Sequence, residues 1–183
     1  MGKRQRGGRT MKRVLVVGSP GAGKSTFARG LRDCTGLPLH YLDRIWHRPD
    51  RTSISREEFD LRLGELLQGE RWILDGNYRR TLGPRLEACD TVFFLDIPLE
   101  DCLSGVESRI GKPREDMPWV ETALDPEFRE YILAFHRTQL PELRALLEKY
   151  REKGTLIRFA SRREGEKYLA HLQESPGKET LLG

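Results

Sequence analysis

The amino-acid sequence predicts an α/β fold, a doubly wound sheet of five parallel strands with helices on both faces. Two observations predict it. Apolar runs of four to six residues alternate with segments whose apolar residues recur at helical spacing. The first run leads through a glycine-rich turn into a helix, as strands do in sheets with right-handed crossovers. At 183 residues the chain is long enough to bury one core, and we expect a single main domain.

The first strand is expected at residues 14–17, four aliphatic residues typical of a buried parallel strand. Residues 18–25 follow with the sequence GSPGAGKS, which matches G-x-x-x-x-G-K-[ST], the phosphate loop of nucleoside-triphosphate-binding proteins. Lys24 begins a helix in which Phe27 and Leu31 share an apolar face. The alternative is a plain glycine turn with a solvated Lys24. Because strand, loop, Lys-Ser pair and helix coincide, we favour the P-loop NTPase fold with a short lid.

The phosphate loop predicts how a nucleotide binds. Its glycines let backbone N–H groups point inward, so that these amides and the positive end of the helix dipole meet phosphate oxygens. Lys24 would then reach the β- and γ-phosphates, and Ser25 would hold Mg²⁺. The residues that we expect to bind ATP here are Gly18, Ser19, Pro20, Gly21, Ala22, Gly23, Lys24, Ser25 and Thr26.

Four further apolar runs predict the remaining strands. Each consists of consecutive aliphatic or aromatic residues, and turn-forming residues such as Gly76 bound them. In chain order they cover residues 37–42, 72–75, 91–95 and 155–159.

Apolar spacing and capping residues predict the other helices. Their apolar residues lie within positions 59–67, 82–86, 128–135, 143–150 and 168–172. The capping pairs are Ser55 with Glu58, Asp125 with Pro126, and Ser161 with Glu164. Pro141 should kink or split the long helical stretch that contains it. The main domain is therefore expected at residues 11–173, with frayed residues 174–183 after it.

Two stretches, residues 44–54 and 110–124, fit neither pattern. Both are long for loops, and both contain basic residues and a tryptophan. Long irregular segments in a compact domain are usually lids or binding loops. The two tryptophans, Trp46 and Trp119, could stack on an acceptor base or close a small core beneath a loop.

Three aspartates follow apolar strands, and ligands of doubly wound sheets bind beyond the carboxyl ends of the strands. Asp75 would suit the orientation of Mg²⁺ through water, and Asp43 would suit an acceptor hydroxyl, as hydrogen-bond acceptor or base. The alternative for each is a polar residue that caps the next helix. For Asp96, which precedes Ile97 and Pro98, we favour the capping interpretation.

The net charge of +4 belongs to the first ten residues, which hold Lys3, Arg4, Arg6 and Arg9 and no acid, so the rest of the chain is formally neutral. This basic tail is expected to be disordered. It could bind a polyanion weakly, or it could be a solvated leader before a true start at Met11; we favour the leader. A neutral domain makes nucleic acid an unexpected partner.

No secretory signal and no apolar run of membrane-spanning length are evident, which predicts a cytoplasmic protein without a membrane partner. The three cysteines, Cys34, Cys89 and Cys102, form no C-x-x-C pair, so buried or free thiols are expected. The four histidines lack the spacing of a metal site.

The chain resembles the adenylate-kinase-like branch of P-loop phosphotransferases. The resemblance rests on residues 18–25, on Asp75 with Arg79 four residues later, and on the order strand, Pro98, helix, arginine-bearing loop and long helix. Within that branch, Asp43 to Trp46 and the segment 72–78 resemble the DNA topology modulation (FlaR-like) proteins. The resemblance covers about residues 11–172.

This resemblance implies roles for further residues. Residues 44–68 would bind the acceptor, and residues 110–124 would form the lid. Arg79 would hold the acceptor's phosphate, Arg109 at the lid base would stabilise the transferring phosphate, and Arg162 would lie beside the nucleotide base. The implied acceptor-binding residues are Asp43, Trp46, Gly76 and Arg79.

Two departures argue against adenylate kinase activity. Adenylate kinases carry Asp-Gly-Phe-Pro-Arg where this chain has DGNYR at residues 75–79. The position that usually holds a nucleotide-stacking arginine falls on Gly105.

The sequence therefore predicts an ATP- and Mg²⁺-dependent kinase of a small molecule or nucleotide. In this hypothesis Lys24, Arg109 and Asp43 are catalytic, and Ser25 and Asp75 hold the metal. The alternative functions are a nucleotide-dependent regulatory or DNA-topology-associated protein that uses ATP binding as a switch, and a bare ATPase. The acceptor, the choice between ATP and GTP, and the oligomeric state stay open.

Overall fold

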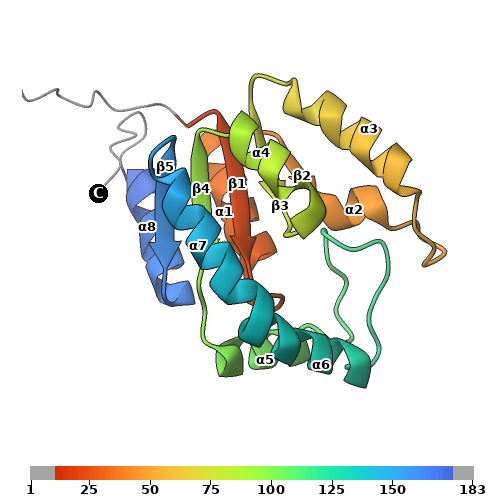
Figure 1. Cartoon of the computed structure of the whole chain (residues 1–183). Coiled ribbons are helices and arrows are strands. Elements are labelled where there is room, and N and C mark those ends of the chain that lie inside the picture. The colour runs from red at the N-terminus through yellow and green to blue at the C-terminus, as the bar shows by residue number, and fades with distance from the viewer. Residues whose placement is uncertain (1–10, 175–183) are drawn as a thin grey trace, which may run out of the picture.

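Five strands pair in parallel in the order β2-β3-β1-β4-β5 in the computed structural model, which describes residues 11–174 (Figure 1). The strands are β1 (Arg13–Gly18), β2 (Leu39–Tyr41), β3 (Trp72–Asp75), β4 (Thr91–Leu95) and β5 (Thr155–Phe159). The helices are α1 (Lys24–Thr35), α2 (Leu42–Trp46), α3 (Arg56–Leu67), η1 (Arg79–Thr81), α4 (Leu82–Ala88), α5 (Leu99–Glu107), α6 (Pro126–Ala134), η2 (Phe135–Gln139), α7 (Leu140–Tyr150) and α8 (Arg162–Glu174). The predicted fold class is confirmed. The expectations for residues 1–10 and 175–183 lie outside the described residues.

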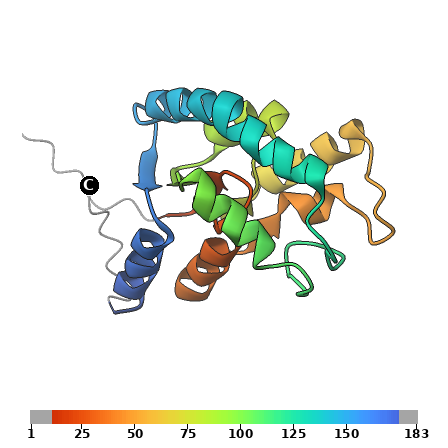
Figure 2. The same ribbon diagram turned by 90° about the horizontal axis from the view of Figure 1, so that it is seen from below.

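Helices cover both faces of the sheet, as Figures 1 and 2 show. One face packs against α1 and α8 through residues such as Val14, Val16 and Phe27. The other packs against α3, α4 and α7 through residues such as Leu15 and Val17. The β1 residues alternate between the two cores because successive strand side chains point to opposite faces. Burial on both faces explains why this strand is an uninterrupted apolar run.

The predicted capping residues hold the helix starts. Ser55 Oγ accepts a hydrogen bond from the backbone N–H of Glu58 at 3.1 Å, and Asp125 accepts one from the N–H of Glu127 at 2.9 Å. These bonds satisfy N–H groups that a helix leaves without partners in its first turn. The local signals therefore gave the correct starts for α3 and α6.

The prediction of a strand over residues 37–42, followed by a loop from residue 44, is wrong at its end. The strand β2 stops at Tyr41, and Leu42 begins the short helix α2, which carries Asp43 in its first turn. Leu42 is fully buried, and Trp46, four residues later, packs against the same core. Helical spacing brings both side chains to one face, whereas a continued strand would point Asp43 and Leu42 to opposite faces.

The expected break near Pro141 is present but begins before the proline. Residues Phe135–Gln139 form a π-helical turn in which the Leu140 N–H donates to the Phe135 carbonyl. Pro141 then lies in the first turn of α7. The proline ring would clash with the carbonyl four residues earlier in a regular helix, and the wider turn removes that clash.

Asp96 does not cap the helix that follows it. Helix α5 has Pro98 as its N-cap and no side-chain cap. The Asp96 carboxylate is buried and pairs with Arg144 at 2.8 Å and Arg158 at 2.5 Å. The favoured capping interpretation is therefore wrong, because the Asp96 carboxylate forms ion pairs with two arginines, one from α7 and one from β5, and not with the start of α5.

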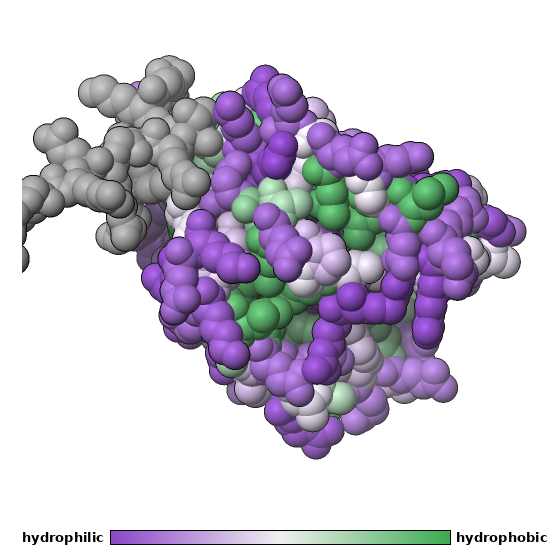
Figure 3. Space-filling model, turned by 45° about the horizontal axis from the view of Figure 1, so that its top comes forward, coloured by the Kyte–Doolittle hydropathy of each residue, from purple (hydrophilic) through white to green (hydrophobic). Residues whose placement is uncertain are grey.

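The face of the molecule seen in Figure 3 is mostly hydrophilic, with apolar side chains showing between charged ones. Cys102 is buried, Cys34 and Cys89 are half-buried, and all three are free thiols. Among residues 11–174 no helix combines the length and the apolar character needed to cross a membrane.

Candidate active site

The turn between β1 and α1 has the backbone that only glycine adopts without strain. Gly21 has φ +80° and Gly23 has φ +94°. A Cβ atom at Gly21 would overlap the backbone carbonyl of Cys102 on α5. The loop is thus packed directly against α5, and the N-terminus of the 12-residue helix α1 faces the space beyond it. Such a helix end attracts phosphate oxygens.

The ammonium group of Lys24 folds back over this loop. Its Nζ donates to the Ser19 carbonyl at 2.9 Å. The side chain is partly exposed to the cavity, but protein surrounds its charged end. Burial lowers the pKa of Lys24, while the negative charges of Asp75 and Asp43 oppose that shift and Arg109 adds to it. The charges that act on Lys24 therefore come from one carboxylate on β3, another on α2 and Arg109.

Asp75 and Ser25 meet beneath the loop. Ser25 Oγ donates to Asp75 Oδ2 at 2.5 Å, and the other carboxylate oxygen, Oδ1, is buried without a hydrogen-bond partner. Burial raises the pKa of Asp75 to about 6, and the nearby Lys24 opposes the shift. A hydroxyl and a carboxylate with an unsatisfied oxygen are hard ligands suited to Mg²⁺. These two residues therefore fit the metal that the loop motif implies.

Residues 76–78, which follow β3, link the phosphate loop to α2. The Asn77 side chain accepts from the Gly18 N–H at 3.2 Å and donates to the Gly18 carbonyl at 2.7 Å. The neighbouring Tyr78 hydroxyl donates to Asp43 Oδ1 at 2.8 Å. Sequence reasoning missed both roles. The only signal was their place directly after Asp75 and Gly76 at a strand end.

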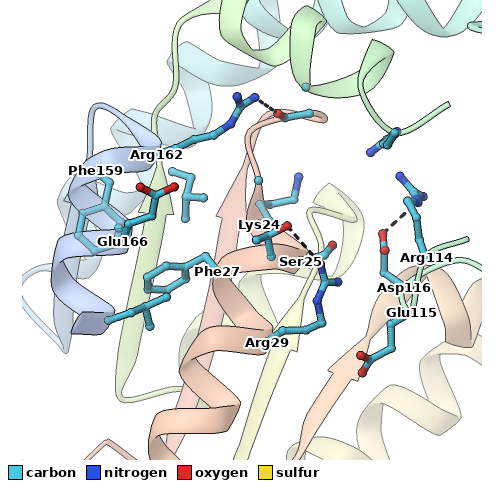
Figure 4. A pocket seen from close by; sticks show the side chains of 18 of the residues that line it. Lys24, Ser25, Phe27, Arg29, Arg114, Glu115, Asp116, Phe159, Arg162 and Glu166 are labelled. Carbon is cyan, nitrogen blue, oxygen red and sulfur yellow. Dashed lines mark hydrogen bonds and ion pairs between the residues drawn. The ribbon is translucent and has the colours of Figure 1, made fainter. Parts of the chain in front are cut away.

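A cavity of about 560 Å³ opens over the loop, between α1, α8 and the lid (Figure 4). This volume falls in the range of small-molecule sites. Phosphate-loop residues line its floor, and basic side chains from three elements point into it. The basic residues of its lining are Lys24, Arg29, Arg109, Lys112, Arg114 and Arg162.

The lid pairs its own arginines with acids. Arg109 Nε lies 3.3 Å from Glu121, and Arg114 lies 3.4 Å from Asp116 and 3.7 Å from Glu121. Burial lowers the pKa of Arg109, and the positive charge of Arg114 adds to that shift. The guanidinium of Arg109 also lies 5.7 Å from the centre of the Phe128 ring. Arg109 lines the same cavity as Lys24.

Residues 110–124 lie against residues 44–51. The Trp119 ring packs edge-on against His47 with ring centres 5.0 Å apart, and Arg51 lies 6.0 Å from the Trp119 ring centre. Arg44 donates to the Glu115 carbonyl at 2.7 Å. The two irregular stretches that the sequence separates by more than fifty residues are therefore in direct contact.

The cavity lining includes none of the expected acceptor residues, which are Asp43, Trp46, Gly76 and Arg79. Trp46 packs against Phe59 and Tyr78, with ring centres 5.5 and 6.2 Å apart, so it contributes to a core beneath the loop. Arg79 is exposed and pairs with Glu142 at 2.5 Å. It lines a second, smaller cavity beside α7. The contact of Arg79 with an acceptor phosphate stays a prediction.

Arg162 fills the space over Gly105. It donates to the Gly21 carbonyl at 2.8 Å and to the Asp101 carbonyl at 2.5 Å. A Cβ atom at Gly105 would overlap both the Arg162 guanidinium and the Gly21 carbonyl. An arginine from α8 therefore occupies the space beside Gly105, the position where this sequence lacks the nucleotide-stacking arginine that the resemblance implies.

This packing predicts the effect of Gly105→Ala. We expect the variant to lose about 1–3 kcal/mol of stability and therefore to unfold at a lower temperature. The added methyl group would overlap the Gly21 carbonyl, which is backbone and cannot move aside as a flexible side chain can. Gly64→Ala in α3 is the matched control, since a Cβ there meets nothing within 4 Å. It should be neutral or stabilising. Thermal unfolding of both variants tests this, and equal stability of the two would contradict the described packing.

The parallel sheet, its strand order and the glycine loop between β1 and α1 define the P-loop NTPase fold. A shikimate kinase from Bacteroides thetaiotaomicron matches with a TM-score of 0.57 at 18% sequence identity, over 90% of this chain and 98% of its own. A shikimate kinase from Acinetobacter baumannii in complex with shikimate matches with a TM-score of 0.53 at 24% identity, over 92% and 97%. At these identities the likeness defines the fold.

No protein-family model matches the chain, and no curated protein does. The resemblance to the topology modulation proteins is therefore not confirmed and stays a prediction.

Proposed function

We propose that the chain is a P-loop kinase that transfers the γ-phosphoryl group of ATP to a hydroxyl of a small molecule. One observation carries the proposal: the negative charges of Asp75, which accepts from Ser25, and of Asp43, which accepts from Tyr78, both act on the ammonium group of Lys24. The cation over the phosphate loop is therefore near both the proposed metal-binding pair and the candidate base. A protein that only binds the nucleotide as a switch needs the metal-binding pair but not the candidate base.

The residues divide the reaction between them. Lys24 and the loop amides hold the β- and γ-phosphates, and Arg162 lies beside the nucleotide base. Ser25 would coordinate Mg²⁺ and Asp75 would orient its water, while the metal, when bound, neutralises phosphate charge. Lys24 and Arg109 stabilise the charge that spreads over the transferring group.

Asp43 faces the acceptor. Tyr78 occupies Oδ1 of its carboxylate, so Oδ2 is left to accept a proton from the attacking hydroxyl. The hydroxyl oxygen bonds to the γ-phosphorus, the bond from that phosphorus to the β–γ bridging oxygen breaks, and ADP leaves. The proton of the hydroxyl passes to Asp43.

Calorimetry with ATP and GTP, with Mg²⁺ or with a chelator, tests the donor side. We expect ATP to bind in a Mg²⁺-dependent manner. Asp75→Asn should lower the affinity for Mg²⁺ in the presence of ATP by about 10–100-fold, as loss of an outer-shell ligand does. Asp60→Asn, which removes an exposed partner of Arg80, is the control and should bind as the parent does. Binding that is insensitive to both chelator and Asp75→Asn would contradict the proposed metal site.

Transfer from γ-labelled ATP to a panel of sugars, cyclic alcohols including shikimate, nucleosides and nucleotides tests the acceptor side. A labelled product supports the kinase. If no compound accepts label while ATP still binds, the nucleotide switch or the bare ATPase replaces it. The cytoplasmic location stays a prediction.

A further inference from the structure

Arg85 on α4 is a fully buried arginine whose guanidinium binds only backbone. Its Nη1 donates to the Gly76 carbonyl at 2.8 Å, and its Nη2 donates to the carbonyls of Asn77 and Tyr78, the latter at 3.0 Å. Its Nε donates to Thr81 at 3.2 Å. Among the described residues, no ion pair joins it to a carboxylate. Burial lowers the pKa of Arg85 to about 10, so it keeps its charge at neutral pH.

The three carbonyls Gly76, Asn77 and Tyr78 belong to a segment with no regular structure. This segment lies between β3 and η1. Tyr78 has φ +32°, a left-handed conformation that a non-glycine residue adopts only when its surroundings hold it there. Carbonyls outside a sheet or helix need other donors when buried. The Arg85 guanidinium, with several donors in a planar fork, donates to all three carbonyls, and the Tyr78 carbonyl also accepts from the N–H and the hydroxyl of Thr81.

The side chains of the same segment point to the two halves of the active site. Asn77 bonds both backbone groups of Gly18, the first residue of the phosphate loop. Tyr78 bonds Asp43, the candidate base. The Arg85 guanidinium therefore binds the backbone carbonyls of the same two residues whose side chains make these bonds, although Arg85 itself is not part of the cavity lining.

We propose that Arg85 is a positioning residue, which holds residues 76–78 in the shape that brings Asn77 to the donor loop and Tyr78 to Asp43. The inference rests on the proposed function. A lysine cannot replace this arginine, because a single ammonium group cannot reach three successive carbonyls in the directions that the fork serves.

A double-mutant cycle on Mg·ATP affinity tests the inference. Arg85→Lys should weaken binding by about tenfold, the effect of about one unsatisfied buried hydrogen-bonding group. In an Asn77→Ala background the same substitution should change affinity by less than about twofold, because the link to Gly18 is already lost. Arg80→Lys is the control: Arg80 is exposed, pairs with Asp60 and should leave affinity unchanged. A purely structural role would give equal losses in both backgrounds and overturn the proposal.

A measurement on the unaltered protein covers the case in which Arg85→Lys does not fold. The ¹⁵N NMR signal of Arg85 Nε–H should be slow to exchange with water and should shift when Mg·ATP is added, although this group does not contact the nucleotide. A signal that does not respond to saturating Mg·ATP would overturn the proposal. If the parent protein binds no Mg·ATP at all, the proposed function itself fails, which this titration distinguishes.

Discussion

Lys24→Met should reduce ATP turnover by about 10²–10³-fold, the loss seen when a preorganised donor to developing charge is removed. The ammonium group lies over the phosphate loop, where negative charge gathers during transfer. Methionine keeps most of the side-chain volume and removes a charge whose burial already lowers its pKa. The variant should therefore stay folded.

Steady-state turnover and circular dichroism check this expectation. Lys12→Met is the matched control, because Lys12 is an exposed lysine whose backbone N–H, not its side chain, bonds Asp90. It should turn over at the parent rate. A folded Lys24→Met protein with unchanged turnover would falsify the catalytic assignment of Lys24.

Asp43→Asn should lower transfer to the acceptor by about 10²–10⁴-fold, the usual contribution of a general base. ATP affinity should change little, since the proposed donor site consists of the phosphate loop and Arg162 and does not include Asp43. The amide keeps the shape of the carboxylate and can still accept from Tyr78. One substitution should thus affect phosphate transfer to the acceptor without affecting ATP binding.

Isotope transfer and calorimetry on the same variant measure the two effects. Transfer at the parent rate would remove Asp43 from the mechanism. Arg79→Ala in the same assay tests whether Arg79 contacts the acceptor. Because Arg79 pairs with Glu142, we expect a small effect; a loss as large as that of Asp43→Asn would mean that Arg79 leaves Glu142 when the acceptor binds.

Local chemistry predicted the elements that local chemistry controls. The glycine loop was evident because its conformation requires glycine at fixed positions, and Gly21 and Gly23 do have positive φ. The helix starts at residues 56 and 126 were evident because a cap acts over two or three residues. The end of β2 was misjudged because burial of Leu42, not its intrinsic preference, begins α2.

Long-range contacts decided the rest. Asp96 and Asp75 both follow apolar strands, yet one meets two arginines and the other meets Ser25. Arg79 and Arg85 lie close together in the sequence, and no local pattern distinguishes them. The fold exposes the first and buries the second against three successive carbonyls.

The sequence alone determined the P-loop class of the fold, the phosphate loop and the positions of most strands and helices, because these depend on residue type at short and regular spacing. Only the tertiary structure decided which charges meet. It brought the charges of Asp43 and Asp75 near Lys24, set residues 110–124 against residues 44–51, and paired Arg79 with Glu142. The physical reason is that a pairing between side chains depends on the distance between elements far apart in the chain, which no local pattern encodes.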